Sequence, residues 1–124
     1  MSDSTQHVEI WCAGEEWCPV TATATMIGKK WHCVIIHRLL ENGPLGFNAL
    51  QEEVDGISSK VLSGSLDDLE QKQLVDREIV NEKPVRVEYS LTDIGESLEP
   101  IIYEMRDWGL EHLDAATDRD SSIA

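Results

Sequence analysis

The chain has 124 residues and a formal net charge of -14, from 24 acidic and 10 basic side chains. This length suits one compact domain, and no apolar run approaches the roughly 18 residues of a membrane span. Residues 1–9 lack the basic start and apolar run of a signal peptide, so we expect a cytoplasmic protein without a membrane anchor. An odd number of cysteines, three, argues against a disulfide framework.

The negative charge bears on the class of partner. A polyanion such as nucleic acid is repelled at long range by an acidic protein, but residues 57–66 hold one cation and no acid. The carboxylate excess also suits a solution of molar salt, which screens charges within about 3 Å. We therefore expect a halophilic source, with an acidic protein from an ordinary cytoplasm as the alternative.

The first predicted element is a short helix. Residues 1–16 are polar and irregular, so we expect a flexible N-terminal segment. Pro19 suits the first position of a helix, which the pattern continues through Met26 and ends at Gly28.

Two further helices follow, and each has one apolar face. The stretch "WHCVIIHRLLENG" places Trp31, Ile35 and Leu39 at helical spacing before it ends at Gly43. The shorter stretch "FNALQEEVDG", residues 47–56, repeats the pattern and closes with an Asp-Gly turn.

The next predicted helix begins almost at once. Ser58 is a good N-cap residue, and Leu62, Leu66 and Leu69 form an apolar stripe behind it. Two helices joined by a tight glycine turn are the helix-turn-helix pattern.

The period then changes from helical to alternating. The stretches "LVDREIV" and "VRVEYSL" predict two strands over residues 74–80 and 85–91, and "NEKP" between them predicts the turn of a hairpin.

A long C-terminal helix completes the predicted order. Thr92 caps it, and Pro100 is expected to kink it. Its apolar stripe is long for the little domain left to pack on, so we expect a homodimer through the terminal helices, with coverage of the chain's own core as the alternative. Residues 114–124 are expected to form a disordered acidic tail. The predicted dimer residues are Leu98, Ile101, Ile102, Met105, Trp108 and His112.

This order of helices and hairpin is mainly α with a small β-hairpin wing, which is a winged helix-turn-helix domain over residues 17–113. The chain resembles the HxlR-type transcriptional regulators, relatives of the MarR group. The resemblance rests on six stretches in order, which are "CPV" at 18–20, "IGKKW" at 27–31, "GFNAL" at 46–50, "GISSKVLSGSLDDLE" at 56–70, "RVEYSLTDIG" at 86–95 and "WGLEH" at 108–112. The sequence departs from the family pattern at Gly46, usually basic, and at Gln73, usually glycine.

The resemblance implies a DNA-binding regulator that is a homodimer on a pseudo-palindromic operator of double-stranded DNA. In such a domain the second helix of the pair enters the major groove. Lys60 can donate to guanine or to phosphate, and serine hydroxyls suit bases or phosphates. A merely solvated face is the alternative, but glycine costs about 1 kcal/mol against alanine in a helix interior. The predicted contacts of this helix are Ser58, Ser59, Lys60, Ser63 and Gly64; Asp67, Asp68 and Glu70 are expected to mark where they stop.

Three basic residues of the hairpin, Arg77, Lys83 and Arg86, are implied by the resemblance to contact phosphate or the minor groove. Glutamates alternate with them, so a surface ion-pair ladder is the alternative. Asn48 is expected either to bond a phosphate or to cap its own helix.

Cys18 stands where many members of that family carry an oxidant- or electrophile-sensing thiol. A thiol before a helix start can have a lowered pKa, whereas a small buried side chain is the alternative. Cys12 could resolve an oxidised Cys18, and Cys33 is expected to be structural.

The sequence has no zinc-ligand spacing and no nucleophile, phosphate-loop or metalloprotease motif, so we expect neither a metal or other cofactor nor an enzyme. Repression is the expected mode because blocking a promoter needs only binding. The alternative is a winged-helix module that binds a protein instead of DNA.

Overall fold

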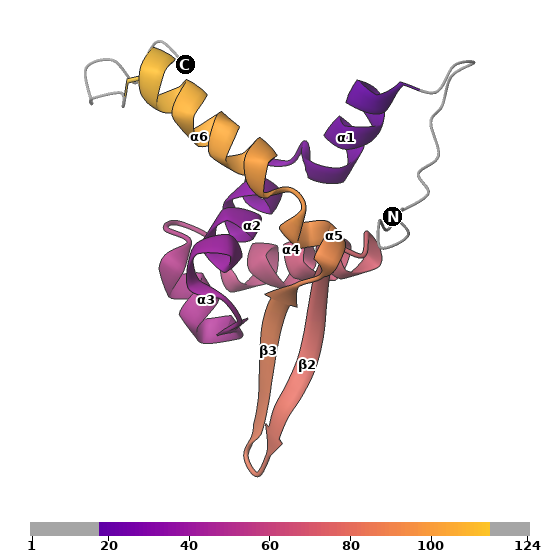
Figure 1. Ribbon diagram of the computed structural model, residues 1–124. Coiled ribbons are helices and arrows are strands. Elements are labelled where there is room, and N and C mark those ends of the chain that lie inside the picture. Colours follow the sequence, from indigo (N-terminus) through magenta and orange to yellow (C-terminus); the bar gives the residue numbers. More distant parts are fainter. Residues whose placement is uncertain (1–17, 115–124) are drawn as a thin grey trace.

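A computed structural model describes residues 18–114 of the chain. The expectations for residues 1–16 and for the tail beyond Asp114 lie outside this part. Within it, the helices gather at one end of a small antiparallel sheet, and the long hairpin of that sheet extends away from them (Figure 1). The elements are α1 (Pro19–Ile27), α2 (Lys30–Asn42), β1 (Leu45–Gly46), α3 (Phe47–Glu53), α4 (Ser59–Gln71), β2 (Val75–Glu82), β3 (Val85–Leu91), α5 (Asp93–Glu96) and α6 (Glu99–His112).

The core forms where the predicted apolar stripes meet. Helices α2, α3 and α4 each direct their stripe inward, so the winged helix-turn-helix fold predicted from the sequence is confirmed. Burial of side chains of this size stabilises the folded state by about 1.5–3 kcal/mol each. The most deeply buried side chains are Ile35, Ile36, Leu50, Val54, Leu62, Leu66, Leu69, Leu74 and Val75.

The wing is the hairpin of β2 and β3. It belongs to a three-stranded sheet of order β1-β3-β2, in which β1 was not predicted from the sequence. This strand, β1, pairs Leu45 with Tyr89 and Gly46 with Glu88. At two residues it is too short to display an alternating pattern. Its pairing fixes the start of α3 against the base of the wing.

Two hydrogen bonds of Thr92 anchor the base of the wing. Its hydroxyl donates to the carbonyl oxygen of Gln73 at 2.7 Å, and its amide donates to that of Leu74 at 3.1 Å. Gly95 lies so close that a Cβ there would sit 2.2 Å from the Leu74 oxygen. Gln73 itself has a φ of 64°, the left-handed backbone conformation that glycine adopts without strain. Gln73 therefore occupies a position whose backbone conformation suits glycine better than a residue with a side chain.

The expectation of one long C-terminal helix is wrong. Thr92 caps α5, which ends at Glu96, and α6 begins at Glu99 with Pro100 in its first turn. A proline ring clashes with the carbonyl four residues earlier but is tolerated in a first turn, where no amide donor is needed. Pro100 therefore starts a new helix and does not kink an existing one.

The break also divides the predicted dimer stripe. Ile102 was expected on the dimer face, but it is 3% exposed and packs in the core of its own chain. Leu98 is half-buried against the same core. Ile101, Met105 and Trp108 remain exposed, so one part of the stripe covers the chain's own core and another part does not, and the dimer stays a prediction.

Candidate nucleic-acid interface

Helix α4 begins at a side-chain cap. The hydroxyl oxygen of Ser58 accepts a hydrogen bond from the amide of Val61 at 3.1 Å, as predicted for an N-cap residue. One of the free amides at the helix start is thereby satisfied, and the remaining ones stay available to an anion.

Gln51 of α3 braces the turn that leads into α4. Its amide nitrogen donates to the carbonyl of Ile57 at 3.3 Å, and its amide oxygen accepts from the hydroxyl of Ser59 at 3.3 Å. The sequence did not single out Gln51, because a side-chain bond to a turn carbonyl leaves no periodic signal. It fixes the two helices of the pair relative to one another.

The exposed face of α4 carries the side chains that the sequence predicts to contact DNA, and we call it the reading face. Ser59, Lys60, Ser63 and Gly64 are exposed, and the leucines are on the opposite side. At 3.6 residues per turn, Lys60, Gly64 and Asp67 follow one line along the middle of this face. A Cβ on Gly64 would meet no atom within 4 Å, so packing within the domain does not explain the glycine.

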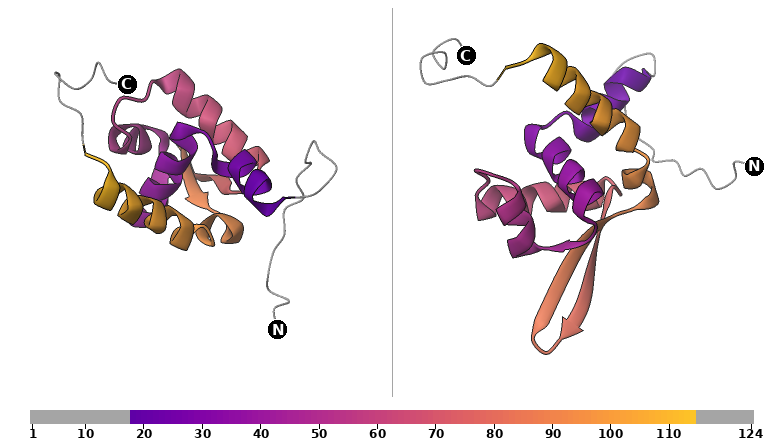
Figure 2. Two further views of the ribbon diagram at one scale, coloured as in Figure 1. Left: turned by 90° about the horizontal axis from the view of Figure 1, so that it is seen from above. Right: turned by 60° about the vertical axis from the view of Figure 1, so that its left-hand side comes forward.

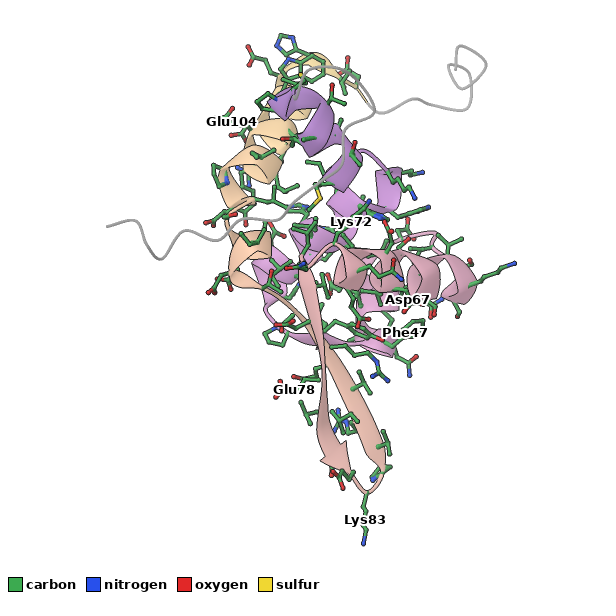
Figure 3. The ribbon with its side chains drawn as sticks, turned by 90° about the vertical axis from the view of Figure 1, so that its right-hand side faces the viewer. Phe47, Asp67, Lys72, Glu78, Lys83 and Glu104 are labelled. Atoms are coloured by element: carbon green, nitrogen blue, oxygen red, sulfur yellow. The ribbon has the colours of Figure 1, made fainter. Side chains whose placement is uncertain are left out.

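Asp67, which was expected to mark the end of the DNA contacts, lies on the same line along α4 as Lys60. Its carboxylate is exposed, whereas Asp68 lies on the side turned toward α1 and α2. Figure 3 shows Asp67 and Lys72 on different sides of α4. A carboxylate in a groove repels phosphate but accepts hydrogen bonds from cytosine amino groups.

The three basic residues of the wing do not share one face. Arg77 pairs with Tyr89 across the ladder, whereas Arg86 pairs with Asn81 after a register shift. Side chains alternate along a strand and directly opposed residues share a face, so Arg77 and Arg86 point to opposite sides. Lys83 extends from the tip (Figure 3).

The alternative of an ion-pair ladder on the wing has no support in residues 18–114. The ion pairs there lie in α2, α4 and α6, and Glu78 stands directly opposite Glu88, a pairing of like charges. Such pairs are destabilising. The wing cations are therefore not engaged with their acidic neighbours.

Asn48 is exposed in the first turn of α3. The N-cap of that helix is Gly46, and no side chain bonds to it, so Asn48 is not the cap. Its amide remains available to a phosphate.

A polar network occupies one flank of α4. His32 Nε2 lies 2.5 Å from Asp68 Oδ2, and Lys72 Nζ lies 2.9 Å from the same oxygen. Lys72 also donates to the carbonyl of Thr25 at 2.9 Å. The hydrogen bond with His32 and then that with Lys72 lower the pKa of Asp68 to about 2. This network links α1, α2 and α4. No sequence pattern predicts it, because Thr25 and His32 stand far along the chain from Asp68 and Lys72.

The two described cysteines have opposite surroundings. Cys18 is the half-buried N-cap of α1, and hydrogen bonds from the backbone and side chain of Thr21 and the backbone of Val20 lower its pKa. Cys33 donates its S–H to the Ile27 carbonyl at 2.9 Å, and burial raises its pKa. A lowered thiol pKa raises the thiolate fraction, so these surroundings favour the thiolate at Cys18 and the neutral thiol at Cys33. Cys12 lies outside the described residues.

Helix α6 lies at the end of the molecule away from the wing (Figure 2), and several of its large apolar side chains are exposed. Trp108 is 59% exposed and Leu110 77%, values unusual for such large apolar side chains. His112 is exposed, with its ring centroid 5.0 Å from that of Trp108. A groove of about 740 Å³ runs along this side, lined by Pro100, Ile101, Glu104, Met105, Trp108, Gly109 and Leu113.

Neither a metal centre nor a membrane segment emerges from the part of the chain that the structure describes. No three His, Cys, Asp or Glu side chains gather there as ligands for a metal ion. Among the same residues, no helix has the length and apolar character to cross a bilayer.

Comparisons with known proteins agree on one family. Residues 26–117 match the family described as HxlR-like helix-turn-helix. The transcriptional regulator YdeP of Bacillus subtilis is 37% identical over 99 residues, covering 80% of this chain and 77% of its own. YodB of the same organism is 38% identical over 96 residues, covering 77% and 85%. The oxidised form of the redox regulator HypR superimposes with a TM-score of 0.73 at 36% identity, covering 79% of this chain and all of that one.

The Asp68 network predicts a specific dependence of stability on pH. Because the folded-state pKa of about 2 lies below the ordinary 3.8, the network stabilises the fold fully above that ordinary value. The stabilisation is lost as the pH falls through 3.8 toward 2. We expect Asp68→Asn to lower the free energy of unfolding at neutral pH by about 2 kcal/mol.

Urea denaturation of wild type and variant across this pH range measures the effect. Asp67→Asn, which changes the exposed carboxylate next to Asp68, is the matched control and is expected to change stability little. Parallel pH profiles for Asp68→Asn and wild type would contradict the assignment.

Proposed function

The chain belongs to the HxlR-like helix-turn-helix family of transcriptional regulators, and we propose that it binds a pseudo-palindromic operator as a homodimer and represses transcription there, in the cytoplasm. The observation that carries the proposal is the two-sided α4, with a leucine stripe on the core and small polar side chains with one cation on the open face. No catalytic role is proposed for any residue.

The proposed operator contacts combine the reading face with the wing. The start of α4 offers free amides, Lys60 and the serine hydroxyls to the major groove. Lys83 at the wing tip would reach phosphate or the minor groove. Arg77 and Arg86 point to opposite sides of the wing, so each would contact the backbone of a different DNA strand. The proposed contacts are Asn48, Ser58, Ser59, Lys60, Ser63, Gly64, Arg77, Lys83 and Arg86.

The proposed dimer uses the exposed part of α6. Ile101, Met105 and Trp108 form an apolar surface that a second copy would cover, with His112 at its end. A two-fold axis there would present two copies of α4 to two half-sites of one operator. Leu98 and Ile102 support this surface from beneath.

A protein-binding module without DNA affinity is the second candidate. Asp67 on the line of Lys60, and the paired Glu78 and Glu88 on the wing, are the observations that favour it. Selection of duplexes from a randomised DNA library separates the two functions. Enrichment of a pseudo-palindrome supports the operator, and a library that stays random supports the protein partner.

Lys60→Ala tests the reading face. Loss of its contact is expected to weaken binding to the selected duplex by about fivefold or more, since a base contact contributes about 1–3 kcal/mol. Fluorescence anisotropy in molar KCl measures it, which also tests whether binding survives the salt predicted from composition. Lys29→Ala, an exposed lysine at the start of α2, is the control. Equal affinity for Lys60→Ala and wild type would remove Lys60 from the interface.

Gly64→Ala separates stability from recognition. Because no atom lies near the added methyl group and alanine is the better helix former, we expect the free energy of unfolding to rise by up to about 1 kcal/mol. The same methyl group would hold DNA away from the helix, so affinity for the selected duplex should fall severalfold. A scrambled duplex of equal length is the control. Unchanged specific affinity would mean that DNA does not approach α4 at this position.

Cys18 is proposed as a regulatory thiol. Its lowered pKa supports this, and the similar proteins HypR and YodB have been studied in oxidised and diamide-treated forms. Diamide takes two electrons and two protons from a pair of thiols as a disulfide forms. We expect diamide to change affinity for the selected duplex severalfold in wild type and in Cys33→Ser, but not in Cys18→Ser. An equal response in Cys18→Ser would exclude this thiol.

A further inference from the structure

We propose that Lys72 couples α1 to the recognition helix α4, so that α1 belongs to the unit that positions the reading face although it contacts no DNA. The inference rests on the proposed DNA-binding function. It makes Lys72 a positioning residue, acting through helix placement and not through contact with the operator.

The first support is the chemistry of two helix ends. Lys72 is the C-cap residue of α4, and its ammonium group reaches the carbonyl of Thr25 in the last turn of α1. The last carbonyls of a helix lack partners within it and carry partial negative charge. The last turn of α1 contains no basic residue of its own. Lys72, which is 47 residues from Thr25 in the chain, therefore supplies a cation at the end of α1.

The second support is the connection to the core. One carboxylate oxygen of Asp68 contacts both the ammonium group of Lys72 and the buried ring of His32. His32 is 2% exposed, so α2 provides a fixed point for both partners. The ammonium group of Lys72 thus joins α1 to α4 at a place that α2 holds in position.

The third support is the slight attachment of α1 elsewhere. Only Ala22 and Ile27 of this helix are buried, and Val20 is 77% exposed. Figure 1 shows α1 projecting away from the remaining helices beyond its last turn. Ile27 reaches the core and its carbonyl accepts a hydrogen bond from Cys33 of α2, so α1 is anchored at its last turn, where the bond from Lys72 joins it to α4.

The coupling has a consequence for recognition. Asp68 and Lys72 lie on a flank of α4, away from the line of Lys60, so their bonds constrain how the helix is rotated and tilted without obstructing the groove. Specific binding needs base contacts in register, whereas nonspecific binding needs only phosphate contacts. Loss of the coupling should weaken the first far more than the second.

The test compares Lys72→Met, Lys72→Arg and the control Lys29→Met on two probes, the duplex selected from the random library and a scrambled duplex of equal length. We expect Lys72→Met to lose about tenfold in specific affinity and less than twofold in nonspecific affinity. Lys72→Arg retains the charge and reach and should recover most of the loss. Equal specific affinities for Lys72→Met and wild type would overturn the proposal.

Hydrogen exchange gives a readout that a merely structural lysine would not change. Because coupling is reciprocal, the selected duplex should slow exchange of the amides at the end of α1 in wild type, and this protection should disappear in Lys72→Met. The wild-type measurement stands even if the variant folds poorly, and absence of protection there would overturn the proposal. A wild type that selects no duplex would instead refute the DNA-binding function.

Discussion

The packing of α4 on α2 is the contact on which the rest of the structure depends. Leu62, Leu66 and Leu69 are fully buried against the core, and their helical spacing leaves no freedom in the rotation of α4. Every other position of the helix is thereby assigned to a face. Lys60 is directed outward and Asp68 toward the flank because the leucines are directed inward.

Periodicity explains which features were predictable. Helices α2 to α4, the Ser58 cap and the hairpin each leave a local pattern, and all are found where the pattern placed them. The break before α6 was not predictable in the same way, because an apolar stripe continues through it. Pro100 suits both a kink and a first turn, and only the surrounding fold decides between them. Ile102 was misplaced for the same reason.

The parts of the candidate site that sequence missed depend on contacts across the chain. The register of the hairpin pairs Arg77 with Tyr89 and so puts it on the side of the wing that Arg86 does not occupy, and the sequence pattern carries no record of this pairing. The pairing of His32 with Asp68 joins two helices through residues 36 positions apart. Neither residue type signals the other, so only the folded chain reveals that Asp68 holds the flank of α4.

Charge placement, more than net charge, decides how an acidic chain can approach DNA. Coulombic repulsion between exposed groups fades beyond about 10 Å at ordinary salt, so distant carboxylates matter little once the surfaces meet. Close to α4, Asp68 is neutralised by Lys72 and turned away from the reading face. Asp67 is the acid that remains there. A site with one cation and one carboxylate on the same line gains little from phosphate attraction, and its selectivity then rests on hydrogen bonds that a correctly placed helix alone can make.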